Sequence, residues 1–143
     1  MLGIAQWATA QEGLHINEVF EGKLLDKEEM QESLVKGENL APYNLKVLHM
    51  LKFSAGSDDR ARVDRLFCQD MQQRISDDDS NMEMESRDGF IYYAIVQLTN
   101  TRKGLHRYIC YQCRDKSDYY LITLVYMEGK ASLADLRKTF KKK

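Results

Sequence analysis

The most regular pattern of apolar and polar positions lies in the last third of the chain. Residues 90–98, 105–113 and 119–127 are rich in Tyr, Ile and Val, and each segment has the length of a β-strand. Two short polar links, residues 100–104 and 114–117, join them and are short enough for hairpin turns. The pattern therefore predicts a three-stranded antiparallel meander over about residues 90–127.

Helical periodicity appears on either side of this meander. Residues 57–76 begin with polar capping residues and then carry apolar side chains at three- and four-residue steps, which predicts an amphipathic helix. The apolar positions of this segment are Val63, Leu66, Phe67, Met71 and Ile75. Leu133, Leu136 and Phe140 have the same spacing and predict a final helix over about residues 132–141.

The remaining segments are less regular. Asp26 and Glu29 resemble a capping pair and Gly37 suits a helix end, so residues 26–37 are expected to belong to an N-terminal helical region. Residues 43–53 fit neither a period of two nor one of 3.6, and both a strand and a helix remain open. Residues 77–89 are acidic without usable periodicity, which predicts a flexible loop.

These elements indicate an α+β fold in a single domain, residues 1–143. A chain of 143 residues with one proline is long enough to bury one core and has no linker-rich stretch. We expect the meander to be covered on one face by helices 57–76 and 132–141, with the N-terminal helical region completing that layer.

The net charge of −1 conceals a strong division along the chain. Residues 1–90 hold 10 Lys and Arg against 18 Asp and Glu, a net charge of −8. Residues 91–143 hold 11 against 4, a net charge of +7. Because the basic part coincides with the predicted strands, we expect an organised positive surface there.

The candidate binding surface lies on the middle strand and its two turns. It comprises Arg102, Lys103, His106, Arg107, Tyr108, Tyr111, Arg114 and Lys116. Strand alternation places Arg107 and Tyr111 on one face and His106 and Tyr108 on the other, with the two turns at opposite ends of the strand. Exposed aromatic rings among basic groups can stack on unpaired bases, although Tyr is also an ordinary strand residue.

Cys110 and Cys113 form the one motif that suggests metal or redox chemistry. A structural zinc site needs four ligands, and no second cysteine or histidine pair with suitable spacing occurs in the sequence. Strand residues three apart also point to opposite faces. We therefore interpret both cysteines as small apolar strand residues and expect no metal ion and no cofactor. Phosphate-binding glycine motifs and hydrolase signatures are absent from the sequence.

The sequence favours a non-catalytic protein-interaction module, an adaptor or assembly protein, whose basic Tyr-rich sheet surface binds a protein partner, in particular an acidic one. An open sheet edge offers a place for a second copy of the chain. The alternative is an RNA or single-stranded nucleic-acid binding protein. A third hypothesis is a metal-independent ribonuclease using His106, Arg107 and a tyrosine.

The expected location is the cytoplasm or the nucleus. No apolar run approaches the roughly 18–20 residues needed to span a bilayer, and the N-terminal residues lack the basic start of a secretory signal. Three cysteines leave one unpaired in any disulfide scheme, which favours a reducing compartment. We expect no membrane partner.

Overall fold

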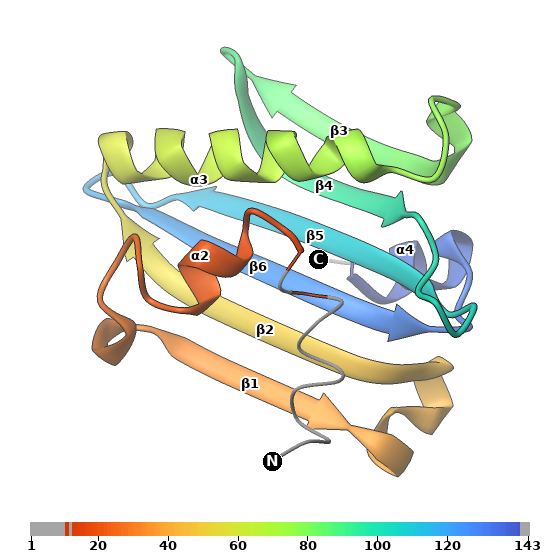
Figure 1. Cartoon of the computed structure of the whole chain (residues 1–143). Helices are drawn as coiled ribbons and strands as arrows, with labels where there is room; N and C mark the ends of the chain where they lie inside the picture. The colour runs from red at the N-terminus through yellow and green to blue at the C-terminus, as the bar shows by residue number, and fades with distance from the viewer. Residues whose placement is uncertain (1–10, 12, 141–143) are drawn as a thin grey trace.

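A six-stranded antiparallel sheet forms the centre of the molecule, with strand order β1-β2-β6-β5-β4-β3 (Figure 1). The structure is a computed structural model that describes residues 11 and 13–140. The strands are β1 Gln31–Lys36, β2 Leu45–Ala55, β3 Met82–Arg87, β4 Phe90–Leu98, β5 His106–Asp115 and β6 Tyr120–Gly129.

The prediction of a three-stranded meander packed against helices is wrong. Strands β4, β5 and β6 do occupy the segments expected for the meander, but β2 pairs with the free side of β6 along its whole length. Strands β1 and β3 then extend the two edges. Pairing between segments about 75 residues apart, such as Leu51 opposite Leu124, leaves no local signature in the sequence.

Residues 43–53, for which the sequence left both a strand and a helix open, lie mostly in strand β2. Leu51 and Phe53 are buried on one face, while Lys52 between them is exposed on the other. Earlier in the strand, Leu48 and Met50 are half-buried on the Lys52 side. Because both faces carry apolar residues there, the alternation typical of a strand is hidden in the sequence.

Two further segments differ from their predicted form. Asp26 does cap a helix, accepting a hydrogen bond from the Glu28 amide at 3.0 Å, but this 3-10 helix spans only Lys27–Glu29 and β1 follows. The acidic segment 77–89, predicted as a flexible loop, contains the 3-10 helix Asp79–Asn81 and strand β3. Met82 and Met84 pack against the core, which fixes β3 against β4 despite its charged residues.

One face of the sheet, the α3 face, is covered by helix α3 (Ser57–Asp70) and the short helix α2 (Asn17–Phe20), which lie in front of the strands in Figure 1. Helix α3 ends before the predicted limit of residue 76, since the chain turns through a 3-10 helix, Met71–Gln73, and the Ile75 amide then bonds to the Gln97 carbonyl oxygen of β4. Val63 and Phe67 are fully buried against the sheet.

A buried carboxylate at the end of α3 holds the segment that leads into α2. The Asp70 oxygens accept hydrogen bonds from the backbone amides of His15 at 2.5 Å and Ile16 at 2.8 Å. Burial raises the pKa of Asp70 above its ordinary value, and the two amide donors offset only part of that effect. The helical region predicted over residues 26–37 is wrong, since that segment is mostly strand β1, and the short helix α2 lies before it; residues 1–10 lie outside the described part of the chain.

In the described part of the chain, helix α4 (Leu133–Phe140) covers only about half of the opposite face, the α4 face. Helix α4 lies behind the sheet in Figure 1 and buries Leu133 and Leu136 against Tyr108, Ile95 and Met127. The two predicted helices therefore lie on opposite faces, not on one, and residue 141 falls outside the described residues. No helix in the described ranges is both long and apolar enough to cross a membrane.

Candidate functional site

The basic residues of the predicted surface are not gathered into one patch. Arg102 and Lys103 are exposed in the turn between β4 and β5. Arg114 is exposed near the end of β5, and Lys116 lies in the turn between β5 and β6. As the sequence indicates, the two turns lie at opposite ends of β5, so the length of a ten-residue strand separates the two pairs of cations.

Arg107 and Tyr111 are buried on the α3 face. The Arg107 Nε donates to the Thr99 carbonyl oxygen at 2.7 Å, and its Nη2 donates to the Thr99 hydroxyl at 3.1 Å. The Tyr111 ring meets Phe67 edge-on with 5.3 Å between ring centroids. Both side chains are buried and make contacts within the protein, so neither is exposed to a ligand.

His106 and Tyr108 belong to the α4 face. Tyr108 is fully buried, its hydroxyl donates to the Ala131 carbonyl oxygen at 2.6 Å, and burial raises its pKa to about 12. His106 is half-buried, with its Nδ1 3.2 Å from the Asn100 Oδ1. The structure therefore does not bring His106 and Arg107 together, and the rings of Tyr108 and Tyr111 offer no stacking surface.

The two cysteines of the Cys-x-x-Cys motif are separated by the sheet. Cys110 belongs to the core on the α4 face and Cys113 to the core on the α3 face. All three cysteines are free, and burial raises the pKa of the Cys110 thiol to about 12. Among residues 11 and 13–140, no three His, Cys, Asp or Glu side chains form a group that could hold a metal ion.

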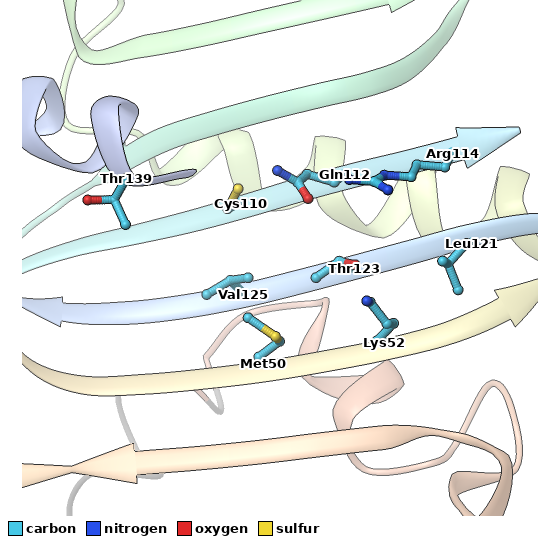
Figure 2. A pocket seen from close by; sticks show the side chains of 9 residues that line it. All are labelled: Met50, Lys52, Cys110, Gln112, Arg114, Leu121, Thr123, Val125 and Thr139. Atoms are coloured by element: carbon cyan, nitrogen blue, oxygen red, sulfur yellow. The ribbon is translucent and has the colours of Figure 1, made fainter. Parts of the chain in front are cut away.

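A pocket of about 270 Å³ opens on the half of the α4 face that α4 leaves uncovered. Strands β2, β5 and β6 form its floor, and α4 contributes Thr139 at one end (Figure 2). Its other polar lining residues are Lys52, Gln112, Arg114 and Thr123. Its apolar lining residues are Met50, Cys110, Leu121 and Val125. We refer to it as the Lys52–Arg114 pocket.

Strand register gives this pocket a charged end and an apolar end. The polar row consists of cross-strand neighbours on β2, β6 and β5: Lys52, Thr123 and Gln112. Two residues further along the strands, on the same face, lies the cross-strand pair Leu121 and Arg114. Two residues away in the opposite direction lies the apolar row, which consists of Met50, Val125 and Cys110. Figure 2 shows Thr139 beyond the apolar row, so α4 bounds that end of the pocket.

The charged end is positive. Lys52 and Arg114 are both exposed, and within the described part of the chain no carboxylate lies within ion-pair distance of either. The described residues that line the pocket include no Asp or Glu. An anion placed there would gain from both cations at low cost, because neither has to leave an internal partner.

Sequence reasoning identified Arg114 but missed Lys52. Lys52 lies in the segment whose element type the pattern left open, and it belongs to the part of the chain with net negative charge. The usable signal was local: Lys52 stands between Leu51 and Phe53, two residues whose burial directs it to the opposite face.

Comparison with known proteins provides one match. No curated protein and no solved structure is significantly similar to the chain. The model of a family of unknown function (DUF6108) matches residues 4–140, nearly the whole chain, and the protein therefore belongs to that family.

Proposed function

We propose that this protein is a non-catalytic protein-interaction module that binds an acidic partner protein on the uncovered half of the α4 face. The observation that carries this proposal is the pair of exposed cations, Lys52 and Arg114, beside an apolar floor without a carboxylate among its described lining residues. Interfaces commonly combine an apolar centre with charged groups that match the partner's charge.

The positions of the reactive side chains support a binding role over a catalytic one. His106 and Arg107 belong to opposite faces of β5, and Arg107 is held by internal hydrogen bonds. The thiol of Cys110 is buried and its pKa is raised to about 12, so it stays protonated near neutral pH. We further propose the cytoplasm or the nucleus as the compartment, on the basis of three free thiols.

A phosphate backbone would also be attracted by Lys52 and Arg114, and the test must therefore separate protein from nucleic acid. Burial of Tyr108 and Tyr111 favours the protein partner, because base stacking would need exposed rings. A nucleic-acid partner would additionally show binding that weakens steeply as the salt concentration rises.

The experiment compares three forms of the tagged full-length chain in chemical crosslinking and capture from a native extract, with and without nuclease. They are the wild type, K52E/R114E, and the control R62E/R65E, which makes the same charge change at exposed cations outside the pocket. We expect K52E/R114E to lose a protein that the wild type and the control retain, and nuclease to have no effect. Equal capture by K52E/R114E, or release of the partner by nuclease, would contradict the proposal.

A further inference from the structure

We infer that the Lys52–Arg114 pocket binds a carboxylate that carries a short aliphatic group: in the partner protein, an Asp or Glu side chain next to an aliphatic residue. The inference rests on the proposed function and specifies the part of the partner that the pocket contacts. It follows from the order of side chains along the pocket, with two cations at one end and three apolar side chains at the other.

The charged end can hold one carboxylate between two cations. Lys52 on β2 lies directly opposite Thr123 on β6. Arg114 lies on β5, the other neighbour of β6, two residues beyond the position that pairs with Thr123. With ordinary strand spacing their Cα atoms are about 12 Å apart, a gap that two long side chains can close from both sides. Figure 2 shows Lys52 directed toward Thr123 and the Arg114 side chain extending toward Gln112. The guanidinium can donate two parallel hydrogen bonds to a carboxylate, and the Thr123 hydroxyl can donate a third.

The other end of the pocket suits an aliphatic group of limited length. Met50 is half-buried there, Val125 and Cys110 are buried beside it, and Thr139 of α4 lies at its end. Because the buried thiol of Cys110 stays protonated, it adds no negative charge beneath the bound group. An aliphatic chain attached to the carboxylate would lie along the strands from the polar row to the apolar row.

The size of the pocket limits what can occupy it. Small-molecule sites usually measure about 300–1,000 Å³, and this pocket of about 270 Å³ is at the small end. It therefore suits one or two side chains of a partner better than a nucleotide or a large cofactor. A nucleic-acid phosphate would contact only the cationic end and leave the half-buried Met50 without a contact.

The inference is tested by NMR titration of the ¹⁵N-labelled full chain with sodium hexanoate, sodium acetate and 1-hexanol. Hexanoate combines the charge and the chain, acetate retains only the charge, and hexanol retains only the chain. We expect hexanoate to shift the backbone amide signals of Thr123, Gln112 and Val125 saturably and to bind more tightly than both comparison compounds. Absence of these shifts, or equal binding by acetate or hexanol, would overturn the inference.

Matched variants locate the two ends of the site. K52Q and R114Q should each weaken hexanoate binding about two- to fivefold, the range measured for exposed charge pairs. M50A should weaken hexanoate while leaving acetate unchanged, because it shortens only the apolar row. The control R65Q, on the exposed side of α3, should bind hexanoate as the wild type does. Wild-type affinity in both K52Q and R114Q would assign the signal to another surface and reject the pocket.

The two experiments fail independently. If hexanoate does not bind but K52E/R114E still loses its protein partner, the carboxylate inference is wrong and the interaction surface stands. If hexanoate binds at the pocket but K52E/R114E retains the partner, the pocket recognises carboxylates while the proposed protein interface is wrong.

Discussion

At the scale of single residues, the most unusual environment is that of Arg60 on α3. Its side chain is only 4% exposed, and its guanidinium carbon lies 4.3 Å from the ring centroid of Phe90, 4.8 Å from Tyr92 and 4.4 Å from Tyr120. Its Nε and Nη2 atoms are buried and have no hydrogen-bond acceptor among the described residues. Attraction to the faces of three aromatic rings, together with the nearby Asp64 carboxylate, therefore compensates the loss of water around this charge.

Removing this side chain should destabilise the fold. We expect R60A to lower the free energy of unfolding by about 2–3 kcal/mol, since the contacts with three rings disappear together and a cavity remains. The measurement is urea denaturation followed by circular dichroism. R60M separates packing from charge: it fills much of the same space, and it should recover only part of the loss if the ring contacts depend on the cation.

The control for Arg60 is on the same helix. Arg62 is exposed, and its nearest carboxylate oxygen, on Asp59, is 3.8 Å away. R62A should therefore change the free energy of unfolding by less than about 0.5 kcal/mol. If R60A and R62A proved equally mild, the ring contacts of Arg60 would contribute nothing to stability.

At the scale of elements, the end of β6 packs directly on the start of β2. A Cβ atom built on Gly129 would lie 2.6 Å from the Leu45 Cα and 2.7 Å from the Asn44 carbonyl oxygen. That same oxygen accepts hydrogen bonds from the amides of Lys130 at 3.0 Å and Ala131 at 2.9 Å. The approach of the two backbones is thus too close for any residue larger than glycine.

Substitution of this glycine should weaken the junction of β2 and β6. We expect G129A to lower the free energy of unfolding by about 1–3 kcal/mol, because neither backbone segment can move without losing hydrogen bonds. The urea midpoint measures the effect. G13A is the matched control, since a Cβ at that position would meet nothing within 4 Å. A midpoint for G129A equal to that of G13A would show that the junction relaxes freely.

The elements that the sequence predicts correctly are those with a strong local pattern. Strands β4, β5 and β6 and helix α3 combine favourable residue types with a clear period, and a local pattern is enough to identify them. Strand β1 is exposed at five of its six positions, so it has no buried stripe to generate a period. Its strand conformation comes from pairing with β2, a contact that no local pattern encodes.

Local patterns also fail to predict the contacts between elements that decide which residues of the candidate site are exposed. Alternation along β5 correctly separates Arg107 and Tyr111 from His106 and Tyr108, and the structure confirms both faces. Alternation does not say what covers each face. Because α4 lies on the face opposite α3, both tyrosines are buried, whereas a cover on one face only would have exposed one of them.

At the scale of the whole molecule, the charge division along the chain does not become a division in space. The sheet order places β2, from the part of the chain with a net charge of −8, beside β6, from the part with a net charge of +7. Lys52 from the first part and Arg114 from the second part consequently line one pocket. Long-range strand pairing, and not the run of charge in the sequence, determines where positive charge gathers.

The two cores, one on each side of the sheet, predict how the thiols of the intact molecule react. Cys68 is exposed, whereas Cys110 and Cys113 are 1% and 5% exposed in different cores. Burial raises the pKa of Cys113, and it raises that of Cys110 to about 12, so that Cys110 stays protonated at pH 8. Both thiols are also shielded from a reagent by the side chains packed around them. A thiol-specific chromogenic reagent should modify one cysteine in the native protein and all three in urea. C68S should show no rapid reaction until it unfolds, and rapid modification of Cys110 or Cys113 in native C68S would mean that the sheet opens on one of its faces.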